Sequence, residues 1–218
     1  MNENNYSSEY FEHIEKGYYP FSYLRDRVII HFVKKLIPNR GSAPRREGKR
    51  ILEIGCGTGR CITQIENDYE TYGMDISAHA ITEAKKRSRA TSFLTASLEA
   101  CDSFSVQFDG IIAINVIEHL ANPEEILQKI NSVLKKGGLL FIHLPTASNK
   151  LSKFLLDRFY KDDTHVYIPS INNLNLAINR AGFQQIYQRS GSFIFLPISN
   201  QKVLEITPPY FGIYKKTQ

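Results

Sequence analysis

Three alternating glycines follow a short apolar run and have the spacing of a ligand-binding loop. Gly55, Gly57 and Gly59 come directly after residues 51–54, an apolar run that also contains Glu53. Glycine lets the backbone turn sharply and lets a ligand approach where a Cβ would collide. The pattern indicates a nucleotide-type crevice. It disfavours a dinucleotide, because the pyrophosphate fingerprint needs a glycine or alanine where this chain has Arg60.

A second acid, Asp75, follows residues 70–74, which are expected to form a strand. At the tip of a strand beside the glycine loop, its carboxylate could accept hydrogen bonds from ribose hydroxyls. Each residue also has a structural alternative. Asp75 could be a favourable charge at the start of the helix that begins at Ser77, and Glu53 could only brace the loop. We interpret Cys56 as a small spacer among the glycines rather than a nucleophile.

These residues must be positioned by an alternation of strands and helices. Short segments between the helical patterns predict strands at residues 51–54, 70–74, 92–95, 108–114 and 139–144, and two more strands are expected at 183–190 and 210–215. Periodic patterns predict helices at residues 21–37, 60–67, 78–89, 123–134, 150–160 and 170–181. Strand and helix in alternation predict an α/β fold, in which helices cover both faces of a parallel sheet.

The helix predicted at 21–37 has apolar residues at spacings of three and four. They are Leu24, Val28, Ile29, Phe32, Val33, Leu36 and Ile37. We expect Arg25, Asp26, Lys34 and Lys35 on the opposite side. We expect one domain over residues 1–218, made of an N-terminal cap and basic connector (1–44) and a core (45–218) with a lid segment near 146–168.

Composition limits the class of protein. The chain has 218 residues, of which 42% are hydrophobic and 22% charged, and its mean hydropathy is -0.28. These values exclude a mainly disordered chain. Without an apolar run of about 18 residues or a secretory signal, we expect a cytoplasmic protein. Three cysteines without paired spacing indicate neither a disulfide framework nor a structural metal.

The ordered motifs together resemble class I S-adenosylmethionine-dependent methyltransferases, in particular the small-molecule branch that includes the ubiquinone-type O-methyltransferases. The resemblance covers most of residues 50–185. It rests on the glycine loop and Asp75, and on the segments 108–120, 135–138, 163–166 and 181–183. It implies a Rossmann-like, doubly wound, mostly parallel seven-stranded sheet with an N-terminal helical cap, and S-adenosylmethionine as the cofactor.

The same resemblance implies a set of cofactor-binding residues. They are Glu53, Gly55, Cys56, Gly57, Gly59, Asp75, Ile76, Ser97, Leu98, Asn115 and Val116. In this reading Glu53 orients the loop, Asp75 holds the ribose and Ile76 flanks the adenine. Many relatives have an aspartate after the third strand, and here Ser97 with the Leu98 backbone would replace it.

Asn115 and Val116, just past the fourth strand, would border the transferable methyl group. Asn115 stands where quinone-type relatives, which use a divalent metal, have the first acid of a Glu-x-x-Glu-His run. Glu118 and His119 alone are too few ligands, so we expect no metal.

Methyl transfer from a sulfonium is an in-line displacement that needs alignment rather than a covalent residue. A hydroxyl acceptor also needs a base. Among the histidines expected at the carboxyl edge of the sheet, we favour His119, with Glu118 beside it. His165 could be catalytic or could anchor the segment after the lid, and for His143, inside a strand, a structural role is favoured.

The tyrosine-rich start of the chain could contribute to the acceptor site. Tyr18, Tyr19 and Tyr23 could contact the sulfonium by cation–π interaction or stack on an aromatic acceptor. The alternative is simple packing of the cap helix. We expect a small-molecule acceptor, whose identity the sequence leaves open.

Three other functions stay open. A basic tract, Lys34, Lys35, Arg40, Arg45, Arg46, Lys49 and Arg50, could bind the phosphates of a nucleic acid, although a solvated connector is the simpler reading. This first alternative, a macromolecular substrate, also includes methylation of a protein. The helix predicted at 150–160 could lie on an anionic membrane surface. A relative that binds the cofactor without catalysis is the third.

Overall fold

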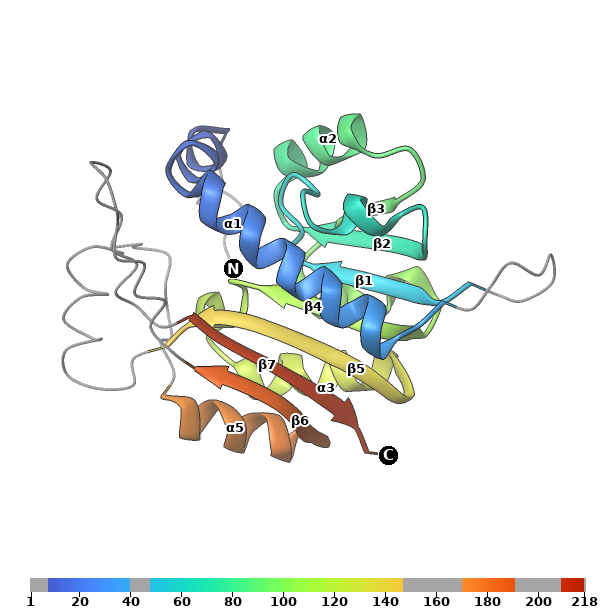
Figure 1. Ribbon diagram of the computed structural model, residues 1–218, viewed down its shortest axis with the longest axis vertical. Helices are drawn as coiled ribbons and strands as arrows, with labels where there is room; N and C mark the ends of the chain where they lie inside the picture. Colours follow the sequence, from blue (N-terminus) through green and yellow to red (C-terminus); the bar gives the residue numbers. More distant parts are fainter. Residues whose placement is uncertain (1–7, 40–47, 147–169, 191–208, 218) are drawn as a thin grey trace.

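The computed structural model describes residues 8–39, 48–146, 170–190 and 209–217, and its strands form one seven-stranded sheet (Figure 1). The strands are β1 (Arg50–Ile54), β2 (Glu70–Asp75), β3 (Ser92–Thr95), β4 (Phe108–Ile114), β5 (Leu134–Pro145), β6 (Phe183–Ser190) and β7 (Pro209–Lys216). Their order is β3-β2-β1-β4-β5-β7-β6. Only the pairings of β7 with β5 and β6 are antiparallel. The prediction of a mostly parallel, Rossmann-like sheet is confirmed.

The described helices agree with the sequence patterns except in length. The helices are α1 (Ser8–Leu36), α2 (Ala78–Arg87), α3 (Pro123–Val133) and α5 (Ile171–Arg180), with 3-10 turns η2 (Ile62–Ile65), η3 (Leu98–Phe104) and η4 (Ile117–His119). α1 begins well before the predicted start. The helix predicted at 150–160 lies outside the described residues. Within the described part of the chain, no helix combines the length and apolarity needed to cross a bilayer.

The segment predicted as a helix at 60–67 is instead the short 3-10 turn η2. Its two buried side chains, Ile62 and Ile65, are three residues apart. Residues at this spacing eclipse one another in a 3-10 helix, so both isoleucines point at the sheet. The backbone N–H of Ile62 donates to the Glu53 carboxylate, 3.0 Å away, which fixes the start of the turn. The predicted helical stretch is therefore shorter than expected and of the 3-10 type.

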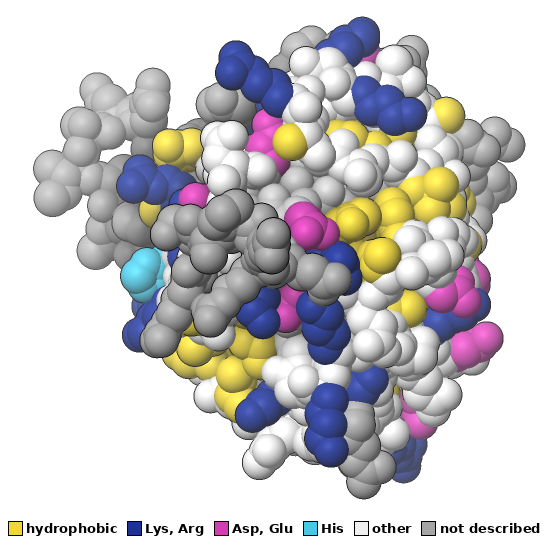
Figure 2. Space-filling view, turned by 90° about the vertical axis from the view of Figure 1, so that its right-hand side faces the viewer, with side chains coloured by type: hydrophobic (Ala, Val, Ile, Leu, Met, Phe, Trp, Pro, Cys, Tyr) yellow, Lys and Arg dark blue, Asp and Glu magenta, His cyan; other side chains and the backbone are white. Residues whose placement is uncertain are grey.

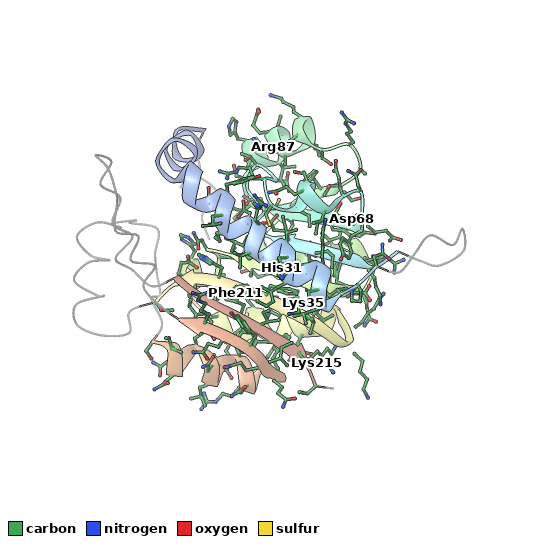
Figure 3. All side chains as sticks on the ribbon, in the orientation of Figure 1. His31, Lys35, Asp68, Arg87, Phe211 and Lys215 are labelled. Carbon is green, nitrogen blue, oxygen red and sulfur yellow. The ribbon has the colours of Figure 1, made fainter. Side chains whose placement is uncertain are left out.

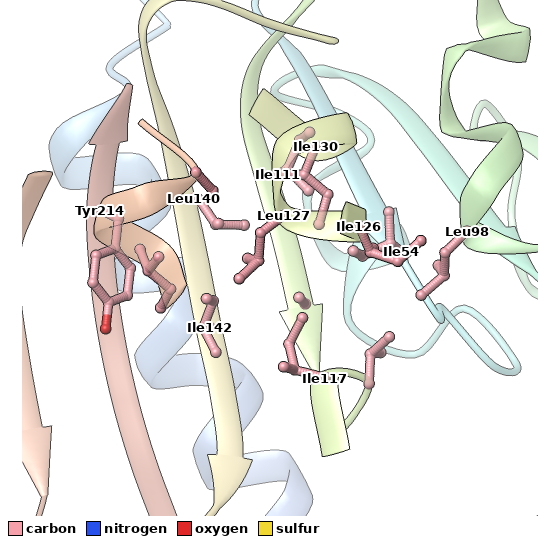
Figure 4. Packing of buried hydrophobic residues seen from close by; sticks show 14 of the residues in the cluster. Ile54, Leu98, Ile111, Ile117, Ile126, Leu127, Ile130, Leu140, Ile142 and Tyr214 are labelled. Atoms are coloured by element: carbon pink, nitrogen blue, oxygen red, sulfur yellow. The ribbon is translucent and has the colours of Figure 1, made fainter. Parts of the chain in front are cut away.

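Hydrophobic clusters cover both faces of the sheet. On one face, residues of α3, α5 and η3 pack on alternate strand positions such as Ile111, Leu140 and Ile142 (Figure 4). On the other face, α1 and η2 pack on the intervening positions, including Ile51 and Ile112. The alternation follows from the two-residue period of a strand, since the central strands such as β1 and β4 are buried on both sides.

The inner face of α1 differs from the prediction. Asp26 was expected on the outer side but is 1% exposed, whereas Leu24 and Val28, expected in the core, are 48% and 41% exposed. The buried stripe passes from Ile29 through Val33 to Ile37. Asp26 continues this stripe toward the N-terminus at the same three- and four-residue spacing. A polar cluster beneath the helix explains why an acid is accepted there.

Aromatic packing joins α1 to the far side of the sheet. The ring of Phe32 lies 5.4 Å from that of Phe211 on β7, which Figure 3 labels, and 4.8 Å from that of Tyr187 on β6. α1 therefore lies over strands from the centre of the sheet to its antiparallel edge. It is an integral layer of the fold.

The amino ends of the strands carry paired charges. Figure 2 shows basic and acidic side chains interspersed on this face. Asp109 accepts from both Lys49 and Lys135 at 2.8 Å. Lys135 belongs to residues 135–138, which were predicted to close a helix ahead of the fifth strand but form part of β5, where its register with β4 shifts. The shift accommodates the extra residues before the strand core.

The burial pattern of α1 leads to a stability prediction. Ile29→Ala should lower the free energy of unfolding by about 2–5 kcal/mol, because the side chain is 1% exposed and its removal leaves a cavity. Val28→Ala, one position away and 41% exposed, should change it by no more than about 0.5 kcal/mol. Urea unfolding of both variants measures the difference, and equal losses would contradict the observed helix face.

Candidate functional site

The glycine loop after β1 adopts a left-handed backbone conformation at its three glycines. Gly55, Gly57 and Gly59 have φ angles of +63°, +50° and +74°, in the left-handed region that favours glycine. A Cβ on Gly55 would lie 2.4 Å from a methyl of Val116. The Cys56 N–H donates to Met74 O at 2.9 Å, which extends the β1–β2 contact into the loop. The backbone of this loop is therefore held in a fixed shape at the carboxyl edge of the sheet.

Asp75 lies at the end of β2, directly beside the glycine loop. Its Oδ2 accepts from the Gly57 N–H at 2.8 Å, and its Oδ1 accepts from the Ser77 N–H at 2.9 Å. Asp75 is 8% exposed, and burial raises its pKa while the backbone N–H groups of Ser77, Gly57 and Ile76 oppose that rise. A carboxylate has about four acceptor positions, so Asp75 retains capacity to accept from a ligand hydroxyl. The helix-start role and a ribose contact are therefore compatible.

Glu53 is part of a polar cluster between α1 and the glycine loop, which we call the α1–loop cluster: Ser22, Arg25, Asp26, Glu53 and Arg60. Arg60 donates to Ser22 Oγ at 2.9 Å, and its guanidinium lies 3.9 Å from the Asp26 carboxylate. Arg25 pairs with Asp26 at 2.8 Å. Asp26 and Glu53 are 1% and 3% exposed. The cluster ties the cap helix to the residues that form the loop.

Burial shifts the ionisation of the groups around the loop. It raises the pKa of Glu53 to about 8, with the neighbouring Asp26 charge acting in the same direction. It also raises the pKa of the Cys56 and Cys61 thiols, and Glu53 adds to that rise. Both thiols are therefore protonated at neutral pH, and a thiol is a weak nucleophile in that form. This agrees with the reading of Cys56 as a spacer.

The turns after β2 and β3 bring further predicted residues to the same edge of the sheet. Ile76 follows Asp75 and is partly exposed. The Ala96 N–H donates to Asp75 O at 3.0 Å, so the turn after β3 lies against the end of β2. Ser97 follows it at the N-cap position of η3, and Leu98, the first residue of η3, is 5% exposed. The structure therefore places Ile76 and Ser97 in neighbouring turns.

The ends of β4 and β5 are joined by two hydrogen-bonded contacts. The Asn115 N–H donates to His143 O at 2.8 Å, and Asn115 Oδ1 lies 3.0 Å from His143 Nδ1. Asn115 is exposed and has a φ of +52°, whereas Val116 is 4% exposed and packs against Gly55. Asn115 and His143 thus lie at the same edge as the glycine loop.

The predicted catalytic and acceptor-site residues are only partly described by the structure. Glu118 and His119 lie in η4 and are 0% and 7% exposed. His165 and the side chains of Tyr18 and Tyr19 lie outside the described part of the structure. Tyr23 is 50% exposed, and the Arg27 guanidinium lies 5.7 Å from its ring centre. Among the residues described, no three His, Cys, Asp or Glu side chains gather as a metal site would require.

Sequence reasoning missed the α1–loop cluster. Arg60 was considered only as a departure from the dinucleotide fingerprint, and Asp26 was assigned to the solvent side. A signal was present, because Asp26 and Ser22 continue the stripe of Ile29 and Val33 at helical spacing. An acid on that stripe indicates a buried partner, since burial of an unpaired charge is costly.

The comparison with protein families identifies the class of protein to which this fold, with a glycine loop at the carboxyl edge of its sheet, belongs. A model of the methyltransferase domain matches residues 21–188. The chain belongs to this methyltransferase domain family.

Curated relatives are similar over part of their length. The chain is 32% identical over 130 residues to a ubiquinone biosynthesis O-methyltransferase of Chelativorans sp., an alignment that covers 56% of this chain and 48% of that protein. With the protein of the same name from Sinorhizobium medicae, identity is 26% over 83% of this chain and 75% of the relative. The chain therefore spans about half the length of the first relative and three quarters of the second.

Solved structures agree on the fold. A magnesium protoporphyrin IX methyltransferase from Synechocystis, crystallised with S-adenosylhomocysteine, superposes with a TM-score of 0.69 at 14% identity, over 99% of this chain and 97% of that one. A SAM-dependent methyltransferase from Archaeoglobus fulgidus gives 0.68 at 20% identity, over 95% and 99%. At these identities the likeness establishes the sheet and its helices alone.

The raised pKa of Glu53 predicts how stability depends on pH. Between about pH 4.5 and 8 the folded state retains a proton that the unfolded state has lost, so the free energy of unfolding falls as pH rises. The contribution is up to about 1.4 kcal/mol per pH unit. Glu53→Gln should reduce this slope in urea unfolding between pH 5 and 8. Glu124→Gln, at a 41% exposed acid on α3, is the control and should leave the slope unchanged.

Proposed function

We propose that this protein is an S-adenosylmethionine-dependent methyltransferase that transfers a methyl group to a small-molecule acceptor, to a hydroxyl oxygen. The supporting observation is the contact between the Gly57 N–H and the Asp75 carboxylate, 2.8 Å apart. It places a glycine loop and an acid side by side at the carboxyl ends of parallel strands, where open α/β sheets bind ligands. Membership of the methyltransferase domain family supports the choice of cofactor.

The proposed cofactor contacts follow the edge of the sheet. Its methionine part would lie against the backbone of residues 55–59, which Glu53 orients by bonding the Ile62 N–H. Asp75 would accept from the ribose hydroxyls, and Ile76 would flank the adenine. Ser97 and Leu98 would contact the adenine from the next turn. Asn115 and Val116 would border the methyl group. Each of these residues lies near the carboxyl end of a strand, in the loop that follows it or, for Leu98, at the start of η3.

Charge at the site fits a cationic ligand. Burial raises the pKa of both Glu53 and Asp75, which means that the folded protein disfavours their negative charges. A nearby positive charge reverses such an effect. S-adenosylmethionine carries a sulfonium and an ammonium group, so its binding would favour ionised acids on both sides of the loop.

The part of the basic tract that the structure describes, which excludes Arg40, Arg45 and Arg46, gives less support to a nucleic-acid substrate. Lys34 pairs with Asp68 at 2.7 Å, and Arg50 pairs with Glu70 at 2.8 Å. Lys49 pairs with Asp109. These charges lie at the amino ends of the strands, away from the glycine loop, and are compensated within the chain. A small-molecule acceptor is also the substrate class that the names of the curated relatives indicate for those proteins.

Other parts of the proposal rest on the resemblance alone. Glu118, His119 and His165 stay candidates for the acid–base step, and Tyr18, Tyr19 and Tyr23 for contact with the acceptor. We also propose a cytoplasmic location, which the three free, buried cysteines favour, since disulfides are rare in reducing compartments.

Ligand-induced stabilisation tests the cofactor assignment. S-adenosylmethionine and S-adenosylhomocysteine should raise the melting temperature, because a ligand that binds only the folded state stabilises it, and NAD should not. Asp75→Asn should weaken S-adenosylhomocysteine about 10- to 100-fold, as expected for loss of hydrogen bonds to a charged group.

Asp109→Asn is the matched control for that titration. Asp109 is also 8% exposed and also accepts a backbone N–H, but it lies at the opposite edge of the sheet. Its substitution should lower the melting temperature without reducing the shift that the ligand causes. The assignment would be contradicted if neither S-adenosylmethionine nor S-adenosylhomocysteine raised the melting temperature of the wild-type protein. It would also be contradicted if the Asp75→Asn variant bound S-adenosylhomocysteine as well as the wild type does.

A further inference from the structure

The turn after β4 has an unusual backbone. Asn115 and Ser105 are the only non-glycine residues with positive φ in the part of the chain that the structure describes. Asparagine tolerates the left-handed region better than most residues, but the conformation still costs free energy. At Asn115 it is held by the bond from its N–H to His143 O and by the contact of its amide with the His143 ring. Such conformations cluster at functional sites.

The contact with Asn115 determines the proton position on His143. Asn115 presents its amide oxygen to Nδ1 at 3.0 Å. An amide oxygen only accepts hydrogen bonds, so Nδ1 carries the hydrogen and donates. In a neutral imidazole the other nitrogen, Nε2, then has a free lone pair. Asn115 therefore fixes the tautomer in which His143 can accept a proton at Nε2.

The surroundings of His143 keep the ring neutral. It lies on the α1 face of the sheet, between Ile114 of β4 and Phe211 of β7, neither of which is charged. Arg25 of α1 is the charged group near it among the described residues. Burial and the Arg25 charge both lower the pKa of His143 well below 6.5. At neutral pH the ring is therefore available as a base.

We propose that His143 is the general base of the transfer, and that Asn115 is the positioning residue that orients it. This rests on the proposed function, since it assumes a hydroxyl acceptor beside the cofactor's methyl group. His143 is partly exposed at the same edge as the glycine loop, whereas His119 is 7% exposed in η4. The favoured base thus differs from the one that the sequence suggested.

The chemical step balances without an added reagent. The acceptor oxygen forms a bond to the methyl carbon while the carbon–sulfur bond breaks, and the bonding electrons pass to sulfur to give a neutral thioether. The hydroxyl proton moves to Nε2 of His143. The resulting imidazolium remains bonded to Asn115 Oδ1 through Nδ1 and returns its proton to water.

Nitrogen NMR of histidine-labelled protein tests the tautomer without knowledge of the acceptor. At pH 7 the His143 signals should show a protonated Nδ1 and an unprotonated Nε2. Asn115→Gly retains a residue suited to positive φ but removes the amide, and should shift the ring toward the Nε2–H form. Arg25→Gln should move the protonation of His143 to higher pH. A wild-type ring with Nε2–H, or an imidazolium at pH 7, would overturn the proposal.

Turnover provides the second test, with S-adenosylmethionine and the hydroxyl probes phenol, catechol and glycerol. His143→Asn retains a donor near the Nδ1 position but has no Nε2, and should lower kcat by about 10²- to 10⁴-fold. Its dissociation constant for S-adenosylhomocysteine should stay unchanged. His31→Asn, at an exposed position on α1, is the control.

The outcomes separate the two proposals. If the wild-type protein does not bind S-adenosylhomocysteine, the proposed function itself is refuted. Intact binding with full turnover in His143→Asn, or a wild-type protein that binds the nucleoside but methylates none of the three hydroxyl probes, would refute the role of His143 alone. A kcat lost in His119→Asn but not in His143→Asn would return the base to His119.

Discussion

Two backbone N–H groups bound to one carboxylate organise the candidate site. Asp75 joins the loop after β1, through Gly57, to the start of α2, through Ser77. Without that acceptor, two largely buried N–H groups would lack partners, at a cost of about 1–3 kcal/mol each. The bond from Gly57 also holds the second glycine of the loop against the end of β2. The backbone of the turn is therefore already held in place by hydrogen bonds within the chain, so a cofactor can bind to a preformed surface there.

The same edge of the sheet concentrates ionisable groups in a partly dry environment. Glu53 lies on the α1 side of the loop and Asp75 on the β2 side, and burial disfavours the charge of both. Arg25 and Arg60 of the α1–loop cluster offset the charge of Asp26. The balance is local, so a change at any of these residues affects the others. Stability, loop shape and ligand charge are coupled through this small set of side chains.

The sequence was sufficient for the sheet and for most of its carboxyl edge. Strands and glycine loops have strong local signals, because buried parallel strands are continuous apolar runs and positive φ selects glycine. The burial of Asp26 and exposure of Leu24 were not predicted, because every apolar residue of α1 was assigned to its buried face. The pairing of Asn115 with His143 joins residues from two strands that only the sheet register brings together. No periodicity within either segment could have indicated it.

The extent of the fold matters for anyone who trims this domain. The family match begins at residue 21 and ends at residue 188, yet β7 (Pro209–Lys216) lies between β5 and β6 in the sheet. A fragment cut at those limits would leave β6 detached, with an interior row of backbone groups exposed on β5. It would also start at the turn of α1 that precedes Ser22, the helix's first described attachment to the glycine loop. The region that sequence similarity outlines is therefore smaller than the unit that can be expected to fold.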